Sequence, residues 1–187
     1  MSSKKRPYTG TTDGVATAKR KGLERFAKFF CDEYGFTNWG TLSVRIMKSA
    51  PADIQRLPID NPKARPWLSV HATGRAVDLH HPNRKIIVAV CDFLVANADQ
   101  LGIEEIHDYN YKADGSEFAW GRGWRCSRNA WKIYDAKANA GTPGGTKQTS
   151  KWIHVELSPE FADDPKKILD ALTAADKTVI PKKKPKK

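Results

Sequence analysis

Metal-binding residue types gather in one short stretch of the chain, SVHATGRAVDLHH, at positions 69–81. This stretch holds three of the five histidines in the sequence. A catalytic zinc ion takes three protein ligands and keeps one position for water, and histidine and aspartate are suitable donors. His71 and Asp78 lie on either side of Gly74, which permits a tight chain reversal. Two short strands joined at this turn would bring both side chains to one point.

A third ligand is expected from the distant segment WIHVEL, residues 152–157. Its alternation is typical of a strand and places Trp152, His154 and Glu156 on one face, with three apolar residues on the other. The apolar face would pack on a core, and the polar face would carry His154 into the site. A single strand histidine is also compatible with an ordinary half-buried side chain. The adjacent histidines that end the first stretch fit a solvated loop before a helix.

The first stretch matches the Ser-x-His-x-x-Gly-x-Ala-x-Asp signature of the D-alanyl-D-alanine peptidase and hedgehog-like zinc family. The segment WIHVEL resembles the second motif of that family, and the resemblance covers about residues 38–158. It implies that His71, Asp78 and His154 are the ligands of a Zn²⁺ ion. Members of the family include cell-wall carboxypeptidases and phage endolysins that cut peptidoglycan stem peptides.

The general base is where the sequence departs from this family. Many relatives have a glutamate three residues before the last histidine, where this chain has Lys151. Other relatives take the acid from a preceding strand, which resembles IEEIHDY at 103–109. The candidates for the base are therefore, in this order, Asp108, Glu105 and Glu156. Alternation places Glu105 and His107 on one face of that strand and Asp108 on the other. Loss of all three carboxylates from the site would leave a metal-binding domain without activity.

Two arginines are candidates for binding substrate. Arg45 resembles an arginine upstream of the first motif in relatives, where it would bind a substrate carboxylate or the developing oxyanion, although a surface strand charge explains it equally well. Arg75 either reaches the substrate or faces solvent. The net charge of +11 is concentrated in lysine-rich ends. Such ends attract polyanions, but charge alone supplies only non-specific, salt-sensitive binding to nucleic acid.

The rest of the sequence predicts one α+β domain, with a small, mainly antiparallel sheet backed by helices, as in the hedgehog-like and D-Ala-D-Ala peptidase fold. We expect a flexible basic arm at 1–17, the zinc peptidase-like domain at 18–175 and a lysine-rich tail at 176–187. The expected helices cover residues 19–35, 83–102 and 158–176. The expected strands cover residues 41–48, 67–71, 75–80, 103–109 and 152–157, with a proline-rich loop at 49–66.

Several classes of protein are disfavoured by the composition. No apolar run reaches the roughly 18 residues of a membrane span, and three cysteines without a C-x-x-C pair do not form a zinc cage. The basic start has no apolar core after it, so we expect no secretory signal.

The expected protein is a monomeric zinc-dependent peptidase of bacterial peptidoglycan, made in a host cytoplasm and acting on the cell wall after release or within a virion. A non-catalytic zinc-binding virion or binding protein and a basic nucleic-acid-associated protein are the alternatives.

Overall fold

The described residues form one six-stranded sheet, in which every strand pairing is antiparallel. The structure, a computed structural model, describes residues 4–111, 121–134, 151–175, 177 and 180–181. The strand order is β1-β2-β6-β3-β4-β5. The strands are β1 Thr37–Gly40, β2 Ala76–His80, β3 Ile103–Asp108, β4 Arg122–Arg125, β5 Ala130–Ile133 and β6 Trp152–Leu157. The α+β class and the mainly antiparallel sheet are thus confirmed.

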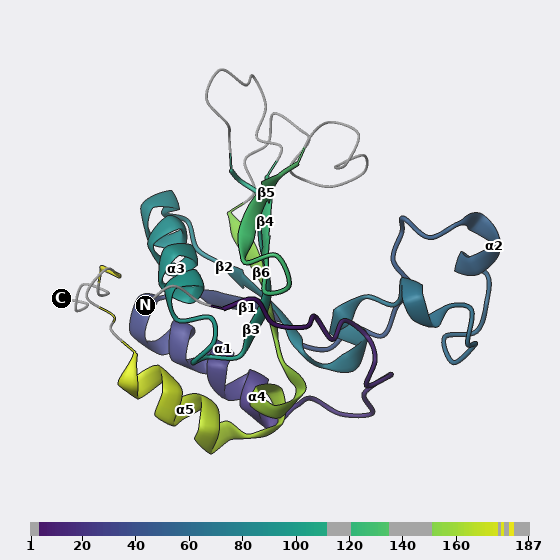
Figure 1. Ribbon diagram of the computed structural model, residues 1–187, viewed down its shortest axis with the longest axis horizontal. Coiled ribbons are helices and arrows are strands. Elements are labelled where there is room, and N and C mark those ends of the chain that lie inside the picture. The colour runs from purple at the N-terminus through teal and green to yellow at the C-terminus, as the bar shows by residue number, and fades with distance from the viewer. Residues whose placement is uncertain (1–3, 112–120, 135–150, 176, 178–179, 182–187) are drawn as a thin grey trace.

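The main helices pack together on one side of the sheet (Figure 1). They are α1 Lys21–Tyr34, α3 Arg84–Ala96, α4 Pro159–Asp163 and α5 Pro165–Ala174. Helix α1 buries an apolar stripe that includes Phe26 and Phe30 and ends at Gly35, whose φ of 77° is left-handed. The side chain of Asn83 caps α3, as the sequence suggested. The helices and the apolar faces of β2, β3 and β6 share one core, so the opposite face of these strands is left for polar residues.

On the other side of the sheet lies a long excursion between β1 and β2, whose far end extends away from the strands (Figure 1). It contains α2 Ala52–Gln55 and the 3-10 turns η1 Arg65–Trp67 and η2 Val70–Thr73. The strands expected at 41–48 and 67–71 are wrong: these segments share only the single bridge Ile46–Leu68. The end of the second segment forms the 3-10 turn η2, so the two segments cannot pair along a continuous strand ladder.

The N-terminal segment, dark purple in Figure 1, is not the free arm expected at 1–17. From residue 4 onward it is bonded to the domain: the backbone N–H of Arg6 donates to Cys126 and that of Ala16 to Ala72. The hydroxyl of Thr9 donates to Glu104 at 2.7 Å. The expected lysine-rich tail at 176–187 lies mostly outside the described residues, although Ile180 is buried against the core. Within the described ranges, no helix is long and apolar enough to cross a membrane.

Candidate metal centre

Three polar side chains face the excursion from neighbouring strands. His154 on β6 lies directly opposite Asp78 on β2 and opposite His107 on β3. Directly opposed residues of antiparallel strands point to the same face of the sheet. Their sequence neighbours, including Val77 and Val155, are fully buried on the helical side. The alternation read from WIHVEL is therefore confirmed, and the polar face of the sheet is the one that carries the chemistry.

His71 joins this face from η2. Gly74 ends the turn with a φ of 69°, a left-handed conformation that favours glycine, and its N–H donates to the carbonyl of His71. The turn therefore supplies the reversal that the sequence suggested, although His71 lies on a 3-10 turn rather than on a strand. Nε2 of His71 lies 3.2 Å from Oδ1 of Asp78.

The donor atoms of His71, Asp78 and His154 form a nearly equilateral triangle. Nδ1 of His154 lies 2.9 Å from Oδ1 of Asp78 and 3.1 Å from Nε2 of His71. In a tetrahedral zinc site with bonds of about 2.0–2.1 Å, neighbouring ligand atoms are about 3.3 Å apart. His71 and His154 are buried, and the Asp78 side chain is 23% exposed, so the triangle opens to one side. Donor types, spacing and access all fit a zinc ion.

The electrostatics of the triangle also favour a cation. Burial alone would lower the pKa of His154, but hydrogen bonds to Asp78 and Glu156 outweigh it and raise the pKa to about 10. Burial of Asp78 is likewise outweighed by His154 and His71, which hold the pKa of its carboxyl well below the usual range. Two ring nitrogens and a carboxylate this close together need a shared positive charge, which a proton or a metal ion supplies.

Glu156 supports His154 from behind. Nε2–H of His154 donates to Oε1 of Glu156 at 3.0 Å, and the hydroxyl of Tyr8 donates to Oε2 at 2.8 Å. A carboxylate behind a ligating histidine fixes the tautomer and the ring orientation. With Nε2 directed at Glu156, Nδ1 of His154 faces Asp78 and His71, and a metal ion in the triangle would replace the proton that Nδ1 otherwise donates to Asp78. Both oxygens of Glu156 are engaged, so it is placed as a support for a ligand rather than as a base.

Glu105 and His107 form a second polar group beside the triangle. Ligand atoms of Glu105, His107 and Glu156 lie within 4.8 Å of one another. Glu105 receives two hydrogen bonds from Arg125, at 3.0 and 2.8 Å, and lies 3.5 Å from Nε2 of His107. Burial raises the pKa of Glu105, but His107 and Arg125 outweigh it and lower the pKa to about 2. This carboxylate is therefore ionised at neutral pH.

Two of the expected site residues lie elsewhere. Asp108 points to the helical side of β3, is fully buried, and is bonded to Arg84 and Arg122. It cannot reach a water molecule at the triangle, so its first place among the candidate bases is corrected. Arg75 is also fully buried and pairs with Glu104 and Asp13, both at 3.1 Å. It neither reaches substrate nor faces solvent. Its two ion pairs connect Asp13 of the N-terminal segment to Glu104 of β3.

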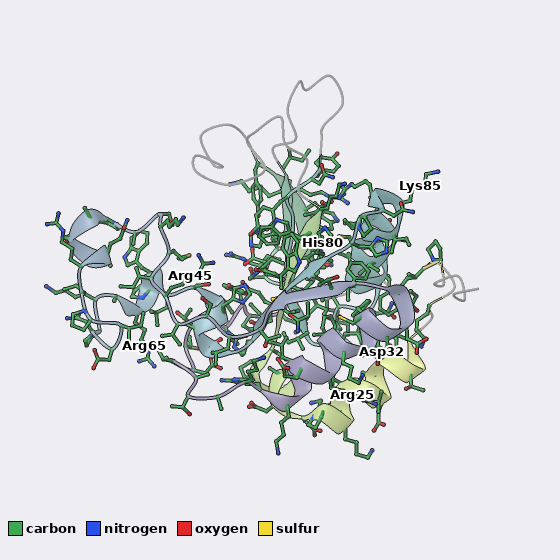
Figure 2. The ribbon with its side chains drawn as sticks, turned by 180° about the vertical axis from the view of Figure 1, so that it is seen from behind. Arg25, Asp32, Arg45, Arg65, His80 and Lys85 are labelled. Atoms are coloured by element: carbon green, nitrogen blue, oxygen red, sulfur yellow. The ribbon has the colours of Figure 1, made fainter. Side chains whose placement is uncertain are left out.

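A cavity of about 460 Å³ opens over the triangle. Arg45 also lines the cavity, and Figure 2 shows this residue between the sheet and the part of the excursion that carries α2. Besides the triangle, the walls include Tyr8, Met47, Glu105, His107, Tyr109, Arg125 and Trp152. The sequence placed His107 on the face of Glu105 but left its role open. Nothing in the sequence signalled Tyr8, which comes from the segment expected to be an arm.

Comparison of the chain with protein-family models, with curated proteins and with solved structures finds no match. The likeness to the D-alanyl-D-alanine peptidase and hedgehog-like family therefore depends on the two motifs alone.

Proposed function

We propose that the protein is a zinc-dependent peptidase that hydrolyses a peptide bond of bacterial peptidoglycan, with His71, Asp78 and His154 as the zinc ligands. The observation that carries the proposal is their donor triangle, with sides of 2.9 to 3.2 Å, at the base of an open cavity. Nitrogen and oxygen donors without cysteine, and one side left open, are typical of catalytic rather than structural zinc. The peptidoglycan substrate follows from the family resemblance.

A zinc ion in this triangle would supply a water molecule of near-neutral pKa and would polarise the scissile carbonyl. Glu156 and Tyr8 keep the His154 ring oriented with Nδ1 toward the other two ligands. Arg45, exposed at the cavity edge, is available to bind a substrate carboxylate. Each of these tasks is one of binding or orientation, so a separate group must accept the proton of the attacking water.

Glu105, together with His107, is the proposed proton-handling pair. Glu105 is ionised, lines the cavity and has its two oxygens bonded to Arg125 and not to a ligand ring, whereas Asp108 is on the opposite face and Glu156 is bonded to the ligand His154. The pair would take a proton from water and return one to the leaving amine. Arg125 and the hydroxyl of Tyr134, bonded to Nδ1 of His107, keep the two side chains in place.

The main rival is a zinc-binding domain without activity. It is favoured by Lys151, which carries no carboxylate where many relatives have one and lines a cavity on the other side of the sheet. The zinc-loaded protein should be incubated with purified cell walls, with and without chelator, and the released muropeptides identified by mass spectrometry. New chain ends that disappear with chelator support the peptidase. Unchanged walls with fully zinc-loaded protein would overturn it and favour the rival.

A further inference from the structure

A row of aromatic rings crosses the polar face of the sheet beside the metal triangle. His80 on β2 lies directly opposite Trp152 on β6, and the adjacent pair along the two strands is Leu79 with Ile153. Tyr109 follows the last residue of β3, and its ring centroid is 4.3 Å from that of Trp152. Trp39 on β1 stacks on His80, with centroids 4.4 Å apart and planes 9° from parallel. The row thus runs through four neighbouring strands as Trp39, His80, Trp152 and Tyr109.

The row is exposed at one end and enters the cavity at the other. Trp39 leaves 56% of its surface in solvent, the largest fraction among the exposed large hydrophobic residues of the described chain. His80 and Trp152 are half-buried, and Figure 2 labels His80 on the sheet. Trp152 and Tyr109 line the cavity that holds the triangle. The row therefore joins an exposed ring, Trp39, through two half-buried rings to the cavity over the triangle.

The position of the row relates it to the metal triangle. His80 follows Asp78 by two residues, and Trp152 precedes His154 by two, so both separations are about 7 Å along the strands. Across four strands spaced by about 4.8 Å, the row extends for about 14 Å, room for about two or three sugar rings. A ligand on the row would therefore lie alongside a peptide held at the triangle.

The charged groups on this face are of both signs, and the carboxylates are paired: Asp78 with His71 and His154, Glu156 with His154, and Glu105 with Arg125. Arg45 adds a single cation at the cavity, not a line of cations beside the rings. Lys151 precedes Trp152 but lines the cavity on the opposite side of the sheet. Binding of a single-stranded nucleic acid needs cations along the row as well as stacking rings. Flat aromatic faces with a negative quadrupole instead suit the apolar C–H face of a neutral pyranose ring.

We propose that Trp39, His80, Trp152 and Tyr109 form a saccharide-binding row that holds the glycan part of a glycopeptide substrate while its peptide lies at the metal triangle. This inference rests on the proposed function, since it names the portion of the substrate bound outside the reacting bond. The enzyme then acts on peptides still attached to sugar more efficiently than on free peptides.

The test is binding of oligomers of N-acetylglucosamine, followed by the chemical shifts of the tryptophan indole N–H groups. Trp39→Ala is the informative variant, because its side chain is exposed and lies outside the triangle. Ile133→Ala, at a position that is 51% exposed on β5, is the matched control. We expect Trp39→Ala to weaken saccharide binding by about tenfold and to leave zinc content unchanged, and Ile133→Ala to bind as the wild type does.

Two outcomes would overturn the row as a saccharide site. One is the absence of saccharide binding by the wild type at millimolar oligomer. The other is a Trp39-dependent affinity for single-stranded oligothymidine instead. Because binding is measured without turnover, a protein that binds saccharide through Trp39 but cuts no wall would refute the peptidase while leaving the row intact. Slower cleavage of sugar-linked peptides by Trp39→Ala, down to the rate of the free peptides, supports the row directly.

Discussion

The phenol of Tyr8 donates a hydrogen bond of 2.8 Å to Oε2 of Glu156, across 148 positions of the chain. The other oxygen of Glu156 accepts from Nε2 of His154 at 3.0 Å. Burial, with the nearby carboxylates of Glu156 and Glu105, raises the pKa of Tyr8 far above its ordinary value, so the phenol remains a donor. The N-terminal segment is thereby linked through two hydrogen bonds to a candidate zinc ligand.

Tyr8→Phe is expected to weaken zinc binding while leaving the fold intact. Without its hydroxyl donor, Glu156 is held less firmly and orients His154 less well. Loss of such an indirect partner of a ligand costs about tenfold or more in metal affinity. Competition with a chromophoric chelator measures the change. Tyr111→Phe is the control, because that ring packs against Arg122 instead, 4.5 Å from its guanidinium carbon. Equal zinc affinities of Tyr8→Phe and wild type would refute the link.

His71→Ala is expected to abolish zinc binding, whereas His80→Gln should retain about one zinc per chain. Elemental analysis of the purified proteins gives the metal content directly. A bound ion also stabilises the folded state by mass action. Chelator should therefore lower the melting temperature of the wild type and of His80→Gln, but not that of His71→Ala. A chelator effect of the same size in all three proteins would place the metal elsewhere.

Glu105→Gln and Glu156→Gln are expected to fail in different ways. The first variant keeps the triangle and its support, so it should bind zinc normally and lose about 10²–10⁴-fold in kcat, the usual share of acid–base catalysis. The second should lose zinc affinity and regain activity when zinc is raised. Turnover of a muropeptide at several zinc concentrations separates the two. Full activity of zinc-loaded Glu105→Gln would remove Glu105 from the mechanism.

The sequence predicted the parts of the site that depend on local pattern. Alternation in WIHVEL gave the correct faces of β6, and Gly74 marked the reversal that brings His71 to Asp78. The same alternation separated Glu105 from Asp108, but choosing between them requires knowing which face of β3 meets the triangle. That is a property of sheet packing. Tyr8 could not be found at all, because its contact joins two ends of the chain and leaves no periodicity in either.

Asp108→Asn is expected to lower stability rather than chemistry. Asp108 is fully buried and bonded to both Arg84 and Arg122. Removing a buried charge from such a group costs about 3–5 kcal/mol, and we expect about 2–3 kcal/mol because Arg84 is partly exposed. Thermal unfolding should shift down by several degrees, and zinc-loaded protein should keep its kcat. Asp92→Asn, an exposed change on α3, is the control. A large loss of kcat without a change in stability would restore Asp108 as the base.

Acid should reveal the Glu105–Arg125 pair independently of any activity. The pKa of Glu105 is lowered in the folded protein from 4.5 to about 2 by His107 and Arg125. A lowered carboxyl pKa stabilises the fold above the unfolded pKa, and that stabilisation is lost as pH falls through the folded value. Its size is on the order of 3 kcal/mol at about 1.4 kcal/mol per pKa unit. The free energy of unfolding, measured with urea, should therefore fall less steeply between pH 5 and 2 for Glu105→Gln than for the wild type. The exposed Glu33→Gln on α1 should follow the wild type. Parallel pH profiles for all three proteins would mean that the pair contributes nothing to folding stability.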